Sequence, residues 1–148
     1  MRFVKNWHVM GFPQNKMTTA TASPKILIIE DQPEILAMMV LLLTRARCEV
    51  QTARNGEEGM QLAQQPDMDL ILLDVDLPDI CGFEICRRLK ESPRVSRIPV
   101  IFVTGRFHEE DRRRGLALGA ADYIEKPFDV SHFVRRILFH IEAAREKV

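Results

Sequence analysis

The chain alternates short apolar runs with longer stretches in which apolar residues recur at helical spacing. Three runs are apolar without alternation, as strands covered on both faces of a parallel sheet must be: 26–29, 70–73 and 100–103. Two weaker runs, 48–53 and 121–124, contain polar residues and therefore fit strands at the edges of a sheet. The pattern predicts five strands.

Helical periodicity fills the intervals that follow the strands: 35–43, 56–64, 82–91, 109–118 and 130–141. Gly119 is placed to end the fourth of these helices. Five strand–helix units with right-handed crossovers predict an α/β fold with a doubly wound, five-stranded parallel sheet in the order 2-1-3-4-5. In such a sheet the ligand site lies at the carboxyl ends of the strands.

A chain of 148 residues with 46% hydrophobic content supports one packed core and is too short for two ordinary domains. We expect residues 1–24 to be a disordered leader, because 18–24 are small, polar and unpatterned, and residues 25–146 to form the domain. A leader that binds a partner is the less favoured alternative.

Charge and cysteine content exclude several classes of function. Lys and Arg number 21 and Asp and Glu also number 21, so no bulk positive field attracts nucleic acid or an anionic membrane. The first residues lack the apolar core of a signal peptide or membrane span. The three cysteines match no zinc pattern and are expected to be reduced thiols. We therefore expect a cytoplasmic protein without direct contact to nucleic acid or membrane.

Polar side chains follow the strands at the edge where the fold places a ligand site. Glu30 and Asp31 follow the first strand, Asp74 the third, Thr104 ends the fourth, and Lys126 follows the fifth. Each residue taken singly is more often a turn former or a helix cap. Together, three carboxylates at one edge would repel one another unless a cation neutralised them. Ligation by oxygen alone points to Mg²⁺.

The same residues suggest a chemical step. Mg²⁺ held by two or three protein oxygens keeps coordination positions for water and for a phosphoryl oxygen. With Asp74 as a carboxylate nucleophile, Lys126 is placed to bind one phosphoryl oxygen and Thr104 to donate its hydroxyl to another. This set predicts a site that forms an acyl phosphate.

Residues 25–145 resemble the receiver domain of response regulators. The resemblance rests on the acidic pair, on Asp74-Val75-Asp76-Leu77-Pro78 with Gly82 four residues beyond the proline, on Thr104-Gly105, and on Lys126-Pro127-Phe128. It implies the flavodoxin-like receiver fold of a chemotaxis-type single-domain regulator. It also implies a two-component phosphorelay, in which a histidine kinase or phosphotransfer protein donates the phosphoryl group.

The resemblance assigns roles to the acidic residues. Asp74 is the expected phosphoacceptor and a Mg²⁺ ligand, and Asp31 binds Mg²⁺ directly. Glu30 binds it through water and Asp76 through its backbone carbonyl. Glu30 stands where Asp is commoner in the family, and Gly105 stands where Ala is more usual, which leaves more room beside the phosphoryl group. Neither departure removes a group that the chemistry needs.

The remaining assignments concern the switch. Thr104 and Tyr123 are the expected switch residues, and we expect phosphorylation to turn Tyr123 from an exposed to a buried position. The Lys126-Pro127 bond is predicted to be cis, because the lysine must turn inward at the end of a strand and only an X–Pro bond adopts cis cheaply.

The sequence is compatible with three alternatives to this interpretation. Asp74-Val75-Asp76 also resembles the DxD nucleophile of haloacid-dehalogenase phosphatases, but in that family the motif ends the first strand, whereas here it ends the third. We therefore expect no enzyme beyond catalysis of its own phosphorylation and dephosphorylation. A receiver-like module that has lost phosphorylation is disfavoured, because every residue that the chemistry needs is present. A receiver fragment detached from a larger regulator or hybrid kinase remains open.

We expect output to pass through the surface of the domain to a downstream protein partner, whose identity the sequence leaves open. The expected face runs from 109–118 across Tyr123 to the helix after Asp129. We expect a monomer or a phosphorylation-dependent homodimer that uses this face.

Overall fold

A computed structural model describes residues 22–147, and most of the expected leader lies outside these residues. The strands are β1 (Lys25–Ile29), β2 (Glu49–Ala53), β3 (Leu70–Leu73), β4 (Val100–Thr104) and β5 (Asp122–Glu125). They form one parallel sheet in the order β2-β1-β3-β4-β5, which confirms the predicted topology. β2 and β5, which the sequence pattern placed at the edges, are the edge strands.

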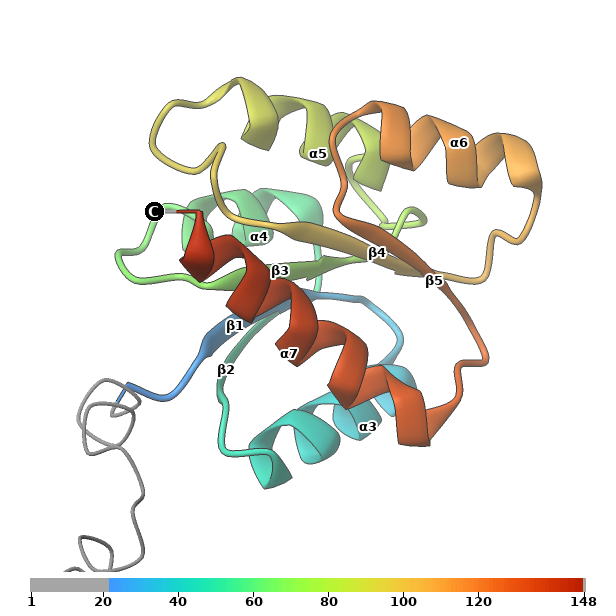
Figure 1. Cartoon of the computed structure of the whole chain (residues 1–148). Helices are drawn as coiled ribbons and strands as arrows, with labels where there is room; N and C mark the ends of the chain where they lie inside the picture. Colours follow the sequence, from blue (N-terminus) through green and yellow to red (C-terminus); the bar gives the residue numbers. More distant parts are fainter. Residues whose placement is uncertain (1–21, 148) are drawn as a thin grey trace, which may run out of the picture.

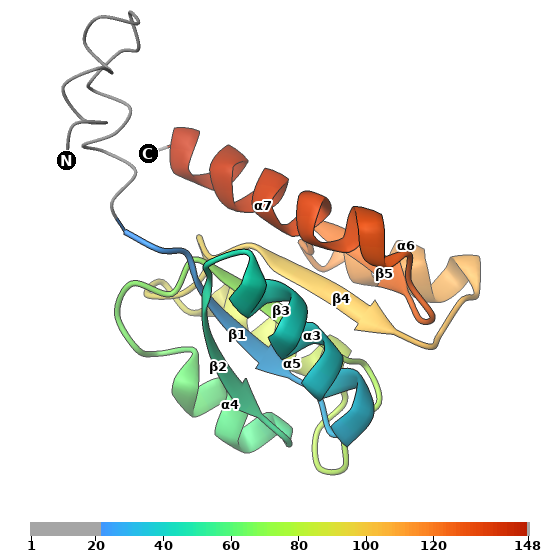
Figure 2. The same cartoon turned by 90° about the horizontal axis from the view of Figure 1, so that it is seen from below.

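The helices are α3 (Pro33–Arg45), α4 (Gly56–Leu62), α5 (Gly82–Glu91), α6 (Glu109–Ala117) and α7 (Val130–Glu146). Figures 1 and 2 show α3 and α7 on one face of the sheet and α4, α5 and α6 on the other. Leu27 and Ile29 of β1 belong to the core beneath the second group, and Ile26 and Ile28 to the core beneath the first. Successive side chains of a strand point to opposite faces, which is why β1 is apolar from Ile26 to Ile29.

The ends of the helices follow local sequence signals. Gly119 has a φ of +100°, the left-handed conformation that glycine adopts just after a helix, and it ends α6 as predicted. Asn55 precedes α4 and accepts a hydrogen bond from the Glu58 N–H at 2.9 Å. α7 continues beyond the predicted end at 141 to Glu146.

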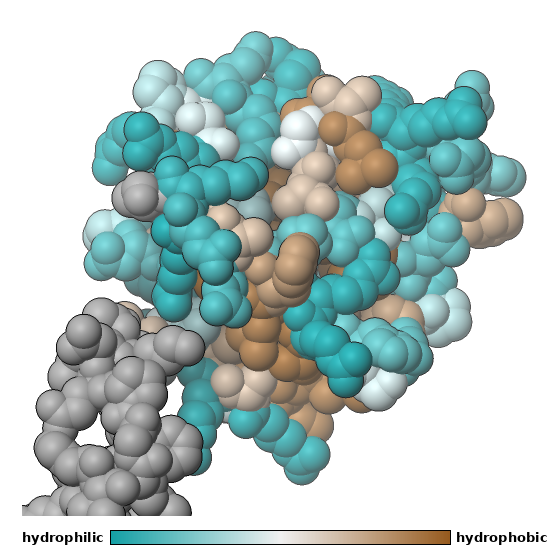
Figure 3. Space-filling model, in the orientation of Figure 1, coloured by the Kyte–Doolittle hydropathy of each residue, from teal (hydrophilic) through white to brown (hydrophobic). Residues whose placement is uncertain are grey.

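The face of the domain drawn in Figure 3 is mainly polar. Figure 3 shows apolar atoms gathered over the part of one face where α3 and α7 lie. Leu41 of α3 and Phe139 of α7 are large apolar side chains that remain exposed. Within residues 22–147, none of the helices combines the length and the apolar character that a membrane crossing requires.

Candidate functional site

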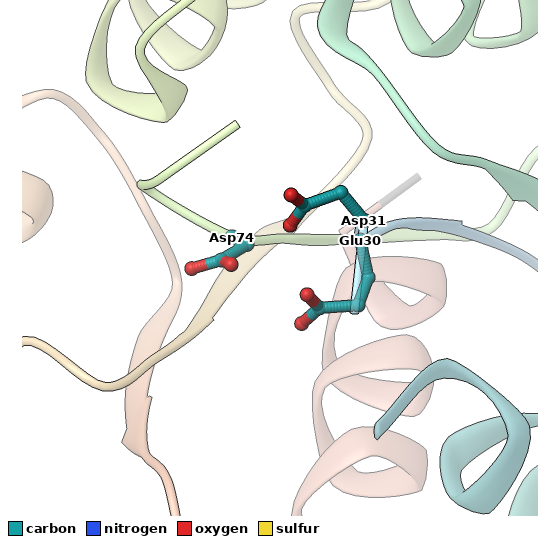
Figure 4. Close-up of side chains that lie close together, drawn as sticks. All are labelled: Glu30, Asp31 and Asp74. Carbon is teal, nitrogen blue, oxygen red and sulfur yellow. The ribbon is translucent and has the colours of Figure 1, made fainter. Parts of the chain in front are cut away.

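The carboxyl ends of β1 and β3 bring three acidic side chains together. Ile29 pairs with Leu73 in the sheet, so Glu30 and Asp74, which follow them, stand side by side. One carboxylate oxygen from each of Glu30, Asp31 and Asp74 lies within 4.8 Å of the others. Figure 4 shows the three carboxylates gathered around one space. We call these three residues the carboxylate rim.

Lys126, directly after β5, supplies positive charge to the rim. Its Nζ lies 3.2 Å from Asp74 Oδ2 and also contacts Glu30 Oε1. It donates a further hydrogen bond to Gln32 Oε1 at 3.3 Å. The Lys126–Pro127 peptide bond is cis, as expected from the sequence. The structure thus places the predicted ammonium against the predicted nucleophile.

The rim is short of positive charge. Among residues 22–147, three carboxylates face one ammonium, and a cavity of about 470 Å³ is lined by Asp31, Asp74 and Lys126. Burial raises the pKa of Glu30 above its ordinary value and the charge of Asp74 adds to this, although hydrogen bonds from Lys126 and the Gln32 N–H oppose it. A divalent cation with oxygen ligands would supply the missing charge. The donor set and the space therefore fit Mg²⁺.

The backbone that carries Asp74 is fixed by close packing. A Cβ atom on Gly82 would lie 2.1 Å from the Asp74 carbonyl oxygen, so only glycine fits at this position. In the same loop, the Asp79 carboxylate accepts hydrogen bonds from the N–H groups of Gly56 at 2.7 Å and Glu57 at 2.9 Å. The loop after β3 is therefore tied both to α5 and to the first turn of α4.

Thr104 ends β4 and is fully buried. Its Oγ1 accepts a hydrogen bond from the Arg106 N–H at 3.3 Å, so the structure does not show the hydroxyl bonded to Asp74. The sheet register pairs Leu73 with Phe102, which places Thr104 one residue beyond the position opposite Asp74. A Cβ atom on Gly105 would meet nothing within 4 Å, so the space beside this turn is open.

Tyr123 already occupies the buried position that we expected only after phosphorylation. Its side chain is 1% exposed, and its ring centroid lies 5.9 Å from that of Phe102. Its hydroxyl donates a hydrogen bond to the Arg106 carbonyl at 2.8 Å, which gives a buried hydroxyl the partner it needs. Burial raises the pKa of Tyr123 to about 12.

Sequence reasoning missed two residues of this region. Arg106 pairs with Asp76 Oδ1 through both Nη2 at 2.7 Å and Nε at 3.0 Å, and the Asp76 side chain is 57% exposed. The Asp76 N–H nevertheless donates to Asp74 Oδ1 at 3.4 Å. Gln32 contacts Lys126. Each missed residue stands within two positions of a recognised motif, and that proximity was the available signal.

Comparison with known proteins agrees with the fold. A sequence profile of the response regulator receiver domain matches residues 26–138. The chain is 37% identical over 125 residues to the phosphate regulon transcriptional regulatory protein PhoB of Rhizobium meliloti (strain 1021), which covers 84% of this chain and 55% of that protein. The chain spans about half the length of several curated relatives that it matches.

Solved structures show the same fold. A putative response regulator from Chloroflexus aurantiacus is 30% identical, with a TM-score of 0.78 and coverage of 82% of this chain and 99% of that one. The receiver domain of a sensor histidine kinase from Pseudomonas aeruginosa PAO1 is 27% identical, with a TM-score of 0.75 and the same coverage of both chains. That second structure holds a magnesium ion coordinated in its active-site cleft. The chain belongs to the response-regulator receiver domain family.

Proposed function

We propose that this chain is the phosphoacceptor of a two-component phosphorelay, and that Asp74 receives its phosphoryl group from a histidine kinase or a phosphotransfer protein. The position of Asp74 carries the proposal. Its side chain is 5% exposed, it shares the rim with two other carboxylates, and it lies 3.2 Å from the Lys126 ammonium. A buried carboxylate with a cation beside it and an open cavity in front is suited to act as a nucleophile toward a phosphoryl group.

The proposed step transfers one phosphoryl group. An oxygen of Asp74 attacks phosphorus, and the new P–O bond forms as the P–N bond to the donor histidine breaks. The electron pair of that bond remains on the imidazole nitrogen, and the product on this chain is an acyl phosphate. Lys126 is placed to bind one phosphoryl oxygen. The Thr104 hydroxyl, which accepts a hydrogen bond from the Arg106 N–H, would donate its own proton to another phosphoryl oxygen.

We propose Mg²⁺ as the cofactor of this step. Asp31 and Asp74 would bind it through their carboxylates, Asp76 through its backbone carbonyl and Glu30 through water. The ion supplies positive charge that offsets the negative charge on the transferring phosphoryl group. The charge deficit of the rim and its oxygen-only donors support this assignment.

The proposed output is a change in a protein-binding surface made by α6, β5 and α7. The partner is a downstream protein, or a second copy of the chain in a phosphorylation-dependent homodimer. Tyr123 lies on β5 between the two helices, and its hydroxyl is bonded to the loop that begins just after Thr104.

The three free thiols support a reducing, cytoplasmic location.

The test is phosphoryl uptake measured by intact mass. Wild type incubated with acetyl phosphate and Mg²⁺ should gain one phosphoryl group, and omission of Mg²⁺ should slow the gain. Asp74→Asn should gain none. Asp122→Asn is the matched control, because Asp122 is also a partly buried carboxylate but stands at the start of β5, outside the rim.

Uptake by Asp74→Asn equal to that of wild type would refute the proposal. A phosphatase of the DxD type would instead hydrolyse many equivalents of a simple phosphate ester. We expect no such turnover, because this chain is proposed to catalyse only its own phosphorylation and dephosphorylation.

A further inference from the structure

Helix α6 packs against the ring of Tyr123 at Gly115. Gly115 is a buried position of this helix, although glycine is a poor helix former. A Cβ atom there would lie 3.0 and 3.2 Å from Cδ2 and Cε2 of Phe102, and 3.1 Å from Cδ2 of Tyr123. Carbon atoms in contact are ordinarily about 3.5–4.0 Å apart. A methyl group at 115 therefore requires one of these rings or the helix to move.

The two rings differ in their freedom to move. Phe102 lies on β4 between two other strands, is fully buried, and meets the ring of Phe83 edge-on at 5.3 Å. Tyr123 lies on the edge strand β5, and its hydroxyl is bonded to the carbonyl of the exposed residue Arg106. The tyrosine can exchange that bond for water by turning outward, whereas the phenylalanine is enclosed by core residues.

We propose that Gly115 is a positioning residue for Tyr123: by lacking a side chain it admits the ring, and it thereby sets the balance between the buried and outward positions of the switch. The contact between Gly115 and the ring is present without a phosphoryl group, so this part of the proposal does not rest on the proposed function. The consequence for signalling rests on the proposed function.

The route from the ring to the phosphorylation site passes through one residue. The Arg106 carbonyl accepts the Tyr123 hydroxyl at 2.8 Å, and the Arg106 N–H donates to Thr104 Oγ1 at 3.3 Å. Any shift of this residue therefore affects both switch residues. We expect the phosphoryl group to be bound more tightly when the Tyr123 ring is buried. A substitution that disfavours the buried ring must then weaken the binding of a phosphoryl mimic at Asp74 by the same coupling free energy.

The chain has a single tyrosine, so full-length protein labelled with 3-fluorotyrosine reports on Tyr123 alone by ¹⁹F NMR. In Gly115→Ala the resonance should move toward that of the denatured protein, and its shift between H₂O and D₂O should increase. Ala117→Ser, at an exposed position of the same helix, should leave the resonance where wild type has it. An unchanged resonance in folded Gly115→Ala would overturn the proposal.

A double-mutant cycle of melting temperatures separates the contact between residue 115 and the Tyr123 ring from other packing effects of the substitution. In the Tyr123→Ala background the space left by the tyrosine lets Phe102 shift by the few tenths of an ångström that the methyl group needs. Gly115→Ala should then raise the melting temperature, because alanine is the better helix former. In the wild-type background the same change should lower it or leave it unchanged. An equal fall in both backgrounds would show that Phe102 or the helix itself resists the methyl group, and would also overturn the proposal.

Beryllofluoride, which stands in for the phosphoryl group on Asp74, tests the signalling half. With saturating Mg²⁺, Gly115→Ala should bind it at least about fivefold more weakly than wild type, the lower end of ordinary coupling between sites. Equal affinity would overturn the coupling between Tyr123 and Asp74. If wild type fails to bind beryllofluoride, the proposed function fails, whereas the fluorine result still decides whether Gly115 positions the ring.

Discussion

Two clusters of charged side chains in this domain differ in how far basic groups compensate their carboxylates. The carboxylate rim sets three acidic groups against the single ammonium of Lys126. At the start of β5, the single carboxylate of Asp122 has two basic partners: Arg136 Nη2 lies 2.6 Å from its Oδ1, and His140 Nε2 lies 3.0 Å from its Oδ2. One cluster is short of positive charge, and the other satisfies its carboxylate.

The pKa values of the two clusters show what this difference means. For Glu30, burial prevails and the pKa is raised. For Asp122, burial also acts to raise the pKa, but hydrogen bonds from Arg136, from the Tyr123 N–H and from His140 outweigh it, and the pKa is lowered. A carboxylate with all its partners stabilises the fold, whereas a buried set that lacks charge is poised to bind a cation.

Replacement of Lys126 by Met should give the largest effect. The change removes the cation that contacts both Glu30 and Asp74, and leaves these two buried carboxylates without it. The loss of one partner from a buried ion pair typically costs about 3–5 kcal/mol. We expect a loss of roughly 3 kcal/mol in the free energy of unfolding at neutral pH without divalent cations, measured by urea denaturation.

Arg136→Met is the matched change in the other cluster. The Arg136 side chain is 42% exposed, and Asp122 keeps its bonds to His140 and to the Tyr123 N–H. Solvent screening therefore limits the loss to about 1 kcal/mol or less. Equal losses in the free energy of unfolding for Lys126→Met and Arg136→Met would contradict the difference between the two clusters.

Mg²⁺ should stabilise the folded protein by an intermediate amount. A ligand that binds only the folded state at ten times its Kd adds about 1.4 kcal/mol, which appears as a rise in Tm. Asp31→Asn should lose most of this response because it removes a proposed ligand. Asp122→Asn should keep the response although it is less stable. A wild-type Tm that does not respond to millimolar Mg²⁺ would show that the rim needs no cation.

The smallest effect is an opposite dependence on pH. The pKa of Asp122 is lowered on folding, so its stabilisation is present above the ordinary value of 3.8 and is lost as pH falls through the folded pKa. The pKa of Glu30 is raised, so stability increases as pH falls through the folded pKa toward the ordinary value of 4.5.

Urea unfolding of Asp122→Asn and Glu30→Gln in metal-free buffer checks these signs. The cost of Asp122→Asn relative to wild type should shrink as the solution is acidified. The cost of Glu30→Gln should instead be lowest at neutral pH and grow on acidification, because the wild type gains stability there by taking up a proton. The same sign for both variants would contradict the assignment of the two pKa shifts.

The sequence predicted the fold and the convergence at the rim for one physical reason. Residues 26–29 of β1 are buried on both faces of the sheet and are all apolar, and such a run marks a central parallel strand. Once the strands are parallel, their carboxyl ends meet at one edge. Glu30 and Asp74 then become neighbours although they lie far apart in the chain.

The surroundings of Tyr123 could not be predicted in the same way. Its burial depends on Phe102 of β4 and Gly115 of α6 meeting at one point, and on the Arg106 carbonyl lying within reach of its hydroxyl. Contacts among three elements leave no periodic signal in the sequence. The ion pair between Arg106 and Asp76 joins two loops and was missed for the same reason.

The account depends most directly on which residue carries the phosphoryl group. Wild-type protein treated with acetyl phosphate and Mg²⁺ can be reduced with borohydride, which converts an aspartyl phosphate to homoserine, and then mapped by peptide mass spectrometry. We predict conversion of Asp74, with Asp31 and Asp76 unchanged. Conversion of a different acidic residue while Asp74 stays intact would contradict the account.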